Sequence, residues 1–213
     1  MKLKTINLAP GLLLGLIPAV CLAQEFSADV VYLAAAKPGA KSGGAESPAH
    51  QPSELYVSKD KIRLETRGVS GTILLLNGAE HTAIALFPAK KAYQHLAGGP
   101  SEYFRGEDAE NACPDWQKAT DQKIECEKVG HEEVDGRQTV KYRNKGASDA
   151  VTSAVWIDSA LKFVVKWESA GAGAELRNIR EAQQAADLFT VPPGYEVLKP
   201  LKAKSKGYLQ KSL

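Results

Sequence analysis

Short runs of apolar and alternating residues follow one another from Phe26 onward, and each has the length of a β-strand. Polar segments of turn length separate the runs, which is typical of antiparallel meanders. Asp135-Gly136 is a strong signal for a two-residue hairpin turn. The runs cover residues 26–34, 54–59, 61–67, 71–77, 81–88, 91–96, 123–130, 133–144, 151–158, 161–169 and 174–184. These roughly ten strands predict a mainly β protein, either a large curved antiparallel sheet or a partly closed barrel.

Two segments interrupt this pattern. Residues 36–53 are rich in Gly, Pro, Ser and Ala, and we interpret them as a long mobile loop inside the domain. Residues 101–122 are polar and lack strand alternation, so they are expected to hold one short irregular helix around residues 107–118. The chain therefore contains little helix beside its strands.

Several strands are apolar at every position instead of at every second one. Examples are Thr72–Leu76, Ala83–Phe87 and Phe163–Trp167. Such strands need cover on both faces of the sheet. Two arrangements satisfy this need: a sandwich of the two strand series, or a curved sheet around an apolar hollow closed by segments 101–122 and 36–53. A hollow of the second kind binds apolar ligands.

The first 23 residues have the organisation of a secretory signal peptide. Lys2 and Lys4 precede a short apolar stretch, Pro18 breaks it, and small residues lead to an expected cleavage after Ala23. The stretch is too short and too interrupted by Gly and Pro to span a bilayer comfortably. A lipid-modified Cys21 is disfavoured, because no small residue precedes it directly. The sequence therefore predicts a protein exported to the periplasm, with secretion as the alternative.

Removing this segment changes the charge and the cysteine count. The whole chain of 213 residues has 27 basic and 25 acidic residues, a net charge of +2 and three cysteines. Without residues 1–23 it is neutral and keeps Cys113 and Cys126, which are expected to form a disulfide in an oxidising compartment. The balanced charge argues against nucleic acid as a partner. No second Cys or His pair stands at the spacing of zinc ligands, so no metal site is expected.

The last segment, residues 197–213, differs from the rest of the chain because it holds five lysines and no acidic residue. We expect a flexible tail. Two interpretations stay open: contact with anionic lipid headgroups, or a frayed, solvated end.

A catalytic constellation is missing from the sequence. The histidines His50, His81, His95 and His131 form no metal-ligand pattern, and no nucleophile stands in a recognisable motif. We therefore expect neither enzymatic activity nor a cofactor. Only a structure that joins His81, His95 and a carboxylate in one cleft would revive an enzyme hypothesis.

The order of several loose motifs resembles a known family. They are Tyr56-Val-Ser-Lys-Asp-Lys-Ile-Arg63-Leu-Glu, Ile73-Leu-Leu-Leu-Asn-Gly78, Leu86-Phe-Pro-Ala-Lys-Lys-Ala-Tyr93, Val155-Trp-Ile-Asp158, Leu161-Lys-Phe-Val-Val-Lys-Trp-Glu168 and Asp187-Leu-Phe-Thr-Val-Pro-Pro-Gly-Tyr195. In this order they resemble the periplasmic lipoprotein-carrier (LolA/LolB-like) superfamily and its secreted relatives. The resemblance covers nearly the whole chain after the signal peptide.

This resemblance implies a half-open antiparallel barrel with a short helical lid over an apolar cavity. Carriers of the superfamily hold the acyl chains of lipoproteins, and relatives sense envelope stress or bind other lipids. An arginine on an early strand hydrogen-bonds the lid in the carriers, and Arg63 stands at the matching position. The alternative for Arg63 is a surface strand residue paired with a nearby acidic side chain. Two features depart from the family: no helix precedes the first strand, and the lid segment 101–122 is poor in apolar residues.

Together these observations predict one domain over residues 24–196, a monomer that binds a lipid or a lipoprotein acyl chain. The alternative is an envelope sensor or protein-interaction domain with a filled core and no lipid ligand. The sequence does not say which sheet face is concave, so the lining candidates come from strands that are apolar on both faces or alternate. They are Val30, Tyr32, Ile62, Leu64, Ile73, Leu75, Ile84, Leu86, Val155, Ile157, Phe163 and Val165.

Overall fold

The computed structural model describes residues 25–33, 53–66, 71–98, 102–120, 124–145, 153–169 and 171–198. The expected signal peptide, residues 1–23, lies outside the described residues. So do most of the expected loop, whose last residue Ser53 instead begins a strand, and the tail beyond residue 198.

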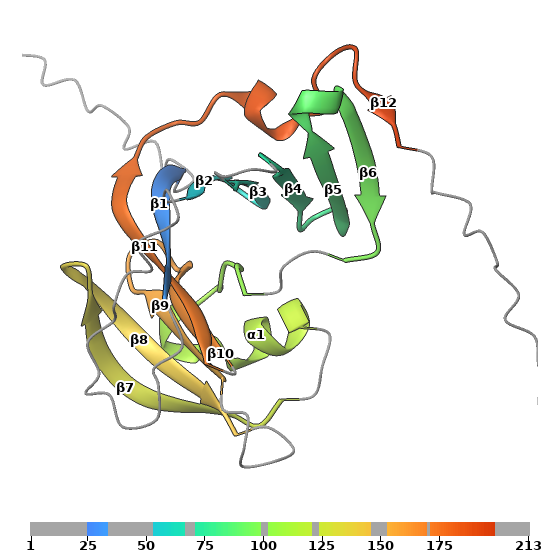
Figure 1. The fold of residues 1–213 in the computed structure, drawn as a ribbon. Helices are drawn as coiled ribbons and strands as arrows, with labels where there is room; N and C mark the ends of the chain where they lie inside the picture. Colours follow the sequence, from blue (N-terminus) through green and yellow to red (C-terminus); the bar gives the residue numbers. More distant parts are fainter. Residues whose placement is uncertain are drawn as a thin grey trace, which may run out of the picture.

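All the described strands belong to one sheet of twelve, in the order β12-β6-β5-β4-β3-β2-β1-β11-β10-β9-β8-β7. The sheet curves strongly and is not closed (Figure 1). The strands are β1 (Phe26–Leu33), β2 (Ser53–Ser58), β3 (Lys61–Glu65), β4 (Ile73–Asn77), β5 (Thr82–Phe87), β6 (Ala92–Leu96), β7 (Cys126–Val134), β8 (Arg137–Asn144), β9 (Ser153–Asp158), β10 (Val164–Ser169), β11 (Ala172–Glu181) and β12 (Glu196–Val197). The predicted mainly β, curved half-open architecture is confirmed, and the sandwich of two sheets is excluded.

The sheet consists of two meanders joined at β1. Strands β1–β6 follow one another in chain order, and so do β7–β11. β1 pairs with β2 on one side and with β11 on the other, for example through Val30 and Leu176. The first strand of the first meander and the last strand of the second are thus brought together in the middle of the sheet.

The predicted hairpin turn at Asp135-Gly136 is confirmed. Both residues have positive φ, 48° and 74°, as a type I′ turn requires, and the turn joins β7 to β8. The strand before it runs through residues 131 and 132, where the sequence suggested a break. A bulge between Lys128 and Gly130 keeps this long strand paired.

Pairing registers define two faces of the first meander, because directly paired residues point to the same side. The inner face carries the row Ala28, Leu55, Leu64, Leu74 and Ala85, each paired with the next. The outer face carries the neighbouring row Tyr56, Arg63, Leu75, Ile84 and His95. Both rows contain leucines, which agrees with the prediction that both faces are covered.

Aromatic and aliphatic side chains fill the inner face where the two meanders meet. Phe26 on β1 contacts Phe163 edge-on, with ring centroids 5.3 Å apart. The inner residues of β1, β2 and β3 join Tyr103, Leu161 and Phe163 in one core cluster. This core gives the curved sheet its interior.

The outer face of the first meander is covered by the chain after β11. We call residues 182–195 the strap; it includes the 3-10 helix η3 (Ala186–Phe189). In Figure 1 the strap crosses above β2–β5, on the side away from the helix α1 (Cys113–Thr120). Arg63 Nη1 donates a hydrogen bond of 2.8 Å to the carbonyl oxygen of Leu188. Leu75 and Leu86 on this face are buried.

The strap ends in β12, which pairs with β6 in parallel through Glu196 and Ala92. This corrects two expectations. The sheet is mixed instead of purely antiparallel, and Val197 is a strand residue instead of the first residue of a flexible tail. Two residues followed by a lysine-rich segment have no strand periodicity, so the sequence showed no sign of β12.

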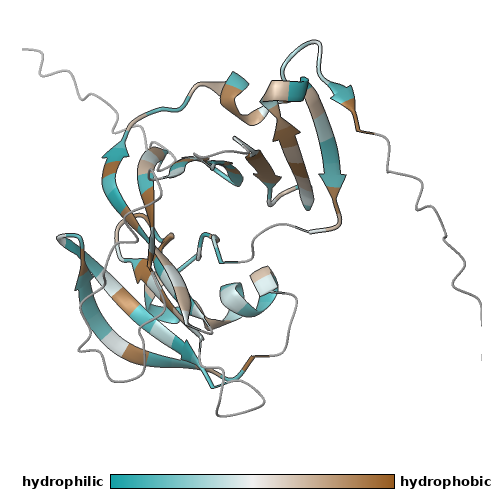
Figure 2. Cartoon of the chain, in the orientation of Figure 1, coloured by the Kyte–Doolittle hydropathy of each residue, from teal (hydrophilic) through white to brown (hydrophobic). Residues whose placement is uncertain are grey.

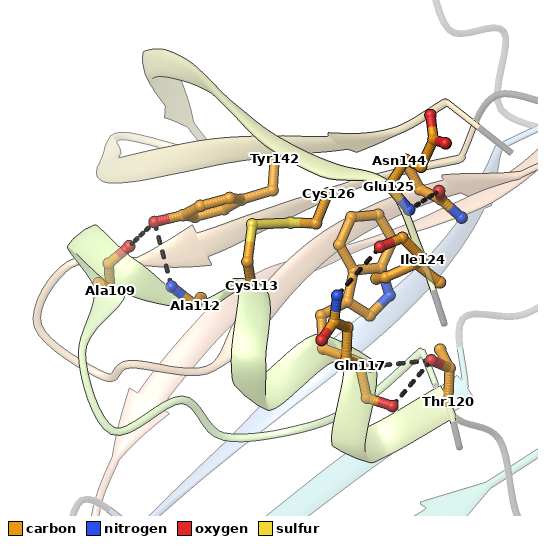
Figure 3. Close-up of a disulfide and its surroundings, with 11 residues drawn as sticks. Ala109, Ala112, Cys113, Gln117, Thr120, Ile124, Glu125, Cys126, Tyr142 and Asn144 are labelled. Carbon is orange, nitrogen blue, oxygen red and sulfur yellow. Dashed lines mark hydrogen bonds between the residues drawn. A yellow bond between two sulfur atoms is a disulfide. The ribbon is translucent and has the colours of Figure 1, made fainter. Parts of the chain in front are cut away.

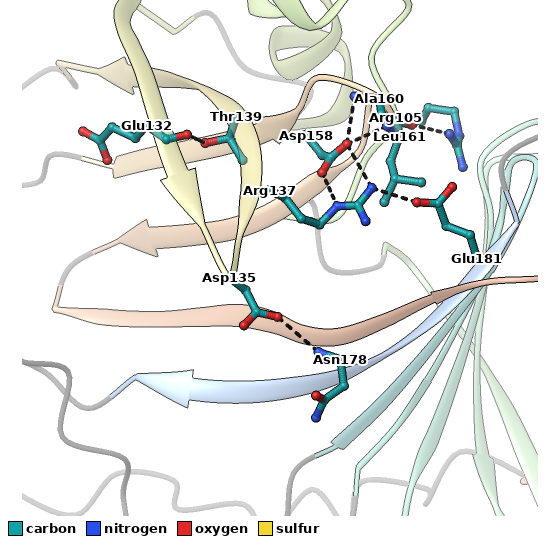
Figure 4. A network of polar contacts seen from close by, with 10 residues as sticks. All are labelled: Arg105, Glu132, Asp135, Arg137, Thr139, Asp158, Ala160, Leu161, Asn178 and Glu181. Atoms are coloured by element: carbon teal, nitrogen blue, oxygen red, sulfur yellow. Dashed lines mark hydrogen bonds and ion pairs between the residues drawn. The ribbon is translucent and has the colours of Figure 1, made fainter.

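A buried carboxylate fixes the turn between β9 and β10. Asp158 is 1% exposed and accepts hydrogen bonds from the backbone N–H groups of Ala160 and Leu161, at 2.9 and 2.6 Å. Arg137 Nε lies 2.5 Å from Asp158 Oδ2, and its Nη2 bonds Glu181 at 2.9 Å (Figure 4). Directly and through Arg137, the carboxylate thus connects the β7–β8 hairpin, the turn between β9 and β10, and β11.

We expect Asp158→Ala to lower the free energy of unfolding by about 3 kcal/mol, because it leaves Arg137 and two backbone donors without their acceptor. Glu181→Ala removes the half-exposed partner of the same arginine and should cost less than about 0.5 kcal/mol. Urea unfolding followed by tryptophan fluorescence measures both. Equal effects of the two substitutions would contradict the assigned role of Asp158.

The strap is held at its start by Glu25. The carboxylate accepts hydrogen bonds from the backbone N–H of Gln184 and from the hydroxyl of Ser58, both at 2.7 Å. These two bonds, the first above all, lower the pKa of Glu25 below 4.5. Because the folded pKa lies below the unfolded one, the contact stabilises at neutral pH and is lost as the pH falls through the folded pKa.

We therefore expect the amide proton of Gln184 to shift in NMR spectra with a midpoint below pH 4.5. In Glu25→Gln this titration should disappear, and the Gln184 amide should exchange faster at neutral pH. A Gln184 shift that stays constant from pH 7 to full acidification in the parent protein would contradict the contact.

Candidate ligand-binding face

The lid segment lies on the inner face of the second meander. It contains a 3-10 helix, η2 (Ala109–Asn111), and the helix α1, which begins later than the predicted 107–118 but in the same segment. Trp116 of α1 and Phe104 are buried against Val140, Tyr142 and Val155 in a second core cluster. One buried indole thus compensates for the low apolar content of this segment.

The lid is fastened at both ends of η2 and at the start of α1. The predicted disulfide between Cys113 and Cys126 is confirmed and ties α1 to β7. The Tyr142 hydroxyl donates to the carbonyl oxygen of Ala109 at 2.8 Å and accepts from the N–H of Ala112 at 3.2 Å (Figure 3). The lid is thus anchored on β7 and β8 of the second meander. The inner face of the first meander makes other contacts.

We expect the double variant Cys113→Ser/Cys126→Ser to lose about 3 kcal/mol of unfolding free energy, because the disulfide closes a short loop in the unfolded chain. Urea unfolding without reductant measures the loss. Dithiothreitol should lower the stability of the parent protein by a similar amount and leave the double variant unchanged. A parent protein insensitive to the reductant after full reduction would contradict this estimate.

The inner face differs between its two halves. On β1–β3 and β8–β10 it is buried under the lid and the core aromatics. On β4–β6 large apolar side chains remain partly exposed, and Figure 2 shows β4 and β5 as strongly hydrophobic strands. We call this surface the inner apolar patch; it consists of Leu74, Leu76, Ala83, Ala85, Phe87 and Leu96.

The patch is continuous with the filled core. Leu74 and Leu76 pack against the cluster that contains Ile62 and Leu64. Ala83 and Ala85 opposite them are small and buried, at 6% and 4% exposure. The exposed part of the patch is therefore formed by its larger side chains, Leu74, Leu76, Phe87 and Leu96.

The structure divides the predicted lining residues between locations. Val30, Ile62, Leu64, Val155, Ile157 and Phe163 are buried in the inner cores, and Val165 is buried in the first of them, at the irregularity of β10. Tyr32 lies on the inner row of β1 and is 40% exposed. Ile73, Leu75, Ile84 and Leu86 lie on the outer face, Leu75 and Leu86 buried there. The latter group cannot line the same surface as the others.

Sequence reasoning missed the residues of the inner apolar patch because β4 and β5 are apolar at nearly every position. Alternation distinguishes the two faces of a strand only when one face is polar. β1 alternates clearly, and the row of paired residues that starts on its inner side leads to Leu74 instead of Ile73. This row can be followed only when the pairing register of the strands is known.

Arg63 also lies on the outer face. Its hydrogen bonds go to Glu65 Oε1 at 2.6 Å and to the Leu188 carbonyl oxygen at 2.8 Å. The expected contact with segment 101–122 is therefore corrected: Arg63 binds the strap, because odd-numbered residues of β3 face away from the lid.

The described histidines do not form a common site. His81 is an exposed turn residue with φ 51°, His95 belongs to the outer row, and His131 pairs with Glu110 at 2.9 Å on the surface. Within the described ranges, three or more metal-ligating side chains gather nowhere. The helices described there include none long and apolar enough to cross a membrane.

Comparison with protein-family models and with curated proteins finds no match. Among solved structures, the chain is similar to an uncharacterised conserved protein from Thermus thermophilus, with a TM-score of 0.50 and 10% identity over 83% of this chain and 91% of that one. This likeness concerns the fold alone.

Two further solved structures are similar at lower TM-scores. One is a putative outer membrane lipoprotein-sorting protein domain from Vibrio parahaemolyticus, with a TM-score of 0.35 and 12% identity over 78% of this chain and 89% of that one. Another is MucB in its complex with MucA from Pseudomonas aeruginosa, with a TM-score of 0.44 and 14% identity. That match covers 79% of this chain and 58% of MucB.

Proposed function

We propose that the chain is an exported, non-enzymatic binding protein of the cell envelope that holds an acyl chain of a lipid or lipoprotein on the inner apolar patch. The observation that carries this proposal is the partly exposed set of Leu74, Leu76 and Phe87 on the concave side of a sheet whose remaining inner surface is filled. Apolar surface of this kind is costly to leave in water without a ligand.

The dimensions suit an acyl chain. The three strands of the patch, β4–β6, span roughly 10 Å across the sheet at about 4.8 Å between neighbours. Each methylene that leaves water on this surface contributes about 0.8 kcal/mol. A chain lying across the strands thus gains affinity from several methylenes, without any polar contact.

The export signal at residues 1–23 and the disulfide support a periplasmic location. In this setting the protein works as a monomer and exchanges its ligand with a membrane or a partner protein. The lysine-rich end, residues 199–213, supplies an electrostatic contact with anionic headgroups during the exchange.

A second candidate function is a sensor or protein-interaction domain without a lipid ligand. The inner face between β1–β3 and the lid favours it, since Phe26, Tyr103 and Phe163 are all buried there in one core cluster. The two functions differ in one observable, which is whether the inner apolar patch binds acyl chains.

Adjacent residues of β4 provide a matched test, because Ile73 and Leu74 are both partly exposed but lie on opposite faces. Leu74→Thr should weaken the binding of a fluorescent fatty acid by about 5- to 30-fold, equivalent to about 1–2 kcal/mol of lost apolar contact. Ile73→Thr should leave the affinity within about twofold, because residue 73 faces away from the inner patch.

Fluorescence titration of the purified chain lacking residues 1–23 measures the affinities, and circular dichroism checks that both variants are folded. Native mass spectrometry of the parent protein should show bound lipid. Equal losses in the two variants, or a parent protein that binds neither cellular lipid nor the probe, would favour the interaction domain instead.

A further inference from the structure

The described part of the chain ends beside the inner apolar patch. After β12, the backbone N–H of Leu198 donates to the carbonyl oxygen of Tyr93 at 2.7 Å, so Leu198 continues the pairing with β6. Val197 pairs with Tyr93, which lies opposite Leu86 on the outer face. Because successive residues of a strand point to opposite faces, Leu198 lies on the inner side, where it is half-buried. The chain therefore leaves the described sheet at the edge of the patch.

The residues beyond this point have a composition suited to an apolar surface with acidic surroundings. We call residues 199–213 the tail; it holds five lysines and no acidic residue. Four of these lysines lie in residues 199–206. Residues 208–213, the apolar segment of the tail, contain Tyr208, Leu209 and Leu213. A basic stretch is thus followed by side chains that gain free energy when they leave water.

The tail is long enough to return to the patch. The patch lies on β4–β6, and β4 is three strand positions away from β12 in the sheet order. This separation is roughly 15 Å at about 4.8 Å between neighbours. The stretch from Lys199 to Tyr208 reaches about 33 Å when fully extended. A segment tethered this closely acts at a local concentration on the order of millimolar, so weak contacts suffice to populate a docked state.

The charge of the lid segment is complementary to that of the tail. Residues 102–118 carry five acidic and two basic side chains, and the acidic Glu107 and Asp108 are exposed. In Figure 1 this segment and α1 lie on the concave side of the sheet, to which the inner faces of β4–β6 also point. The lysines of the tail are therefore attracted to the same side of the molecule as the patch.

We propose that the tail docks on the inner apolar patch of its own chain and covers it when no ligand is bound. Its apolar segment packs on the leucines of the patch, and the lysines before it face the acidic lid segment. This inference rests on the proposed function, because the tail and the acyl ligand then share one site. The tail is thus a built-in competitor: it shields the patch from water and gives way only to a ligand that binds more tightly.

Paramagnetic broadening in NMR spectra tests the contact without any ligand. In the chain lacking residues 1–23, Ser212→Cys adds a single free thiol beside the disulfide-bonded pair, and a nitroxide label is attached to it. The label should broaden the amide signals of Leu74 and Leu76, and leave that of Gly136 in the β7–β8 turn unchanged. High salt, about 0.5 M, should weaken the broadening, because it screens the lysines from the lid.

Binding of Nile red, an uncharged apolar dye, tests the competition. A chain shortened to end at Leu198 should bind the dye about three- to tenfold more tightly than the full chain, because the tail covers the patch in most ligand-free molecules. Tyr208→Ser/Leu209→Ser should have a similar effect. The matched control Gln210→Ser/Ser212→Ala changes two polar residues of the same segment and should stay within about twofold of the parent protein. Fluorescence titration measures all four affinities.

The two proposals fail in different ways. If the label broadens no amide of the patch, or if the full and shortened chains bind the dye equally, the tail does not cover the patch and the acyl-binding function stands. If a labelled protein broadens the patch of a second, isotope-enriched copy mixed with it, the occupant is another molecule and the proposal is wrong. If the patch is broadened within one chain but neither chain binds the dye or a fatty acid, the docked tail stands and the acyl-binding function fails.

Discussion

The pairing of β1 with β11 is the constraint on which the rest of the structure depends. Without it the chain would form two separate meanders, and the core cluster that both contribute to would not exist. β1 lies in the middle of the sheet, although it is the first strand of the chain, and its partner is the last long strand. This contact between distant parts of the chain brings Phe26 onto Phe163 and creates the common core.

Local irregularities shape this pairing. The register shifts between Ser27 and Asp29, and Asn178 opposite them adopts φ 52°. The Asn178 side chain donates to Asp29 Oδ2 at 2.7 Å, and its backbone N–H donates to Asp135 Oδ2 at 3.2 Å (Figure 4). At the other end, a Cβ on Gly173 would lie 2.7 Å from the Trp167 carbonyl oxygen, so β10 and β11 approach closely only because this residue is glycine.

Both faces of the sheet are covered with few helices, in a different way on each meander. The strap covers the outer face of the first meander. On the second, long side chains take its place: Lys141 and Lys166 each hold an ammonium 4.6 Å from the ring centroid of Trp156, and Glu132 accepts the indole N–H at 2.7 Å. The alkyl parts of such lysines shield apolar surface while their charges stay in water. Trp156 is thus buried, at 2% exposure, with these charged side chains around its ring.

The sequence predicts local features of this fold, but not those that depend on contacts between distant segments. Strands β1–β11, the Asp135-Gly136 turn and the disulfide follow from local patterns and were predicted at or near their observed positions. The assignment of Leu74 to the inner face and of Leu75 to the outer one depends on the register with β3, which local patterns do not contain. The strap has no periodic pattern, so Arg63 was assigned to the wrong cover.

The way the sheet ends has a consequence for the behaviour of the protein in a crowded compartment. A sheet with two open edges is a template for edge-to-edge aggregation. At one edge, β12 is only two residues long and parallel to β6, so it offers little backbone to a second molecule. At the other, β7 is interrupted by the bulge near Gly130 and carries exposed charges at Lys128, Glu132 and Glu133. Both edges therefore discourage strand addition, and apolar side chains on the concave surface stay available for small ligands.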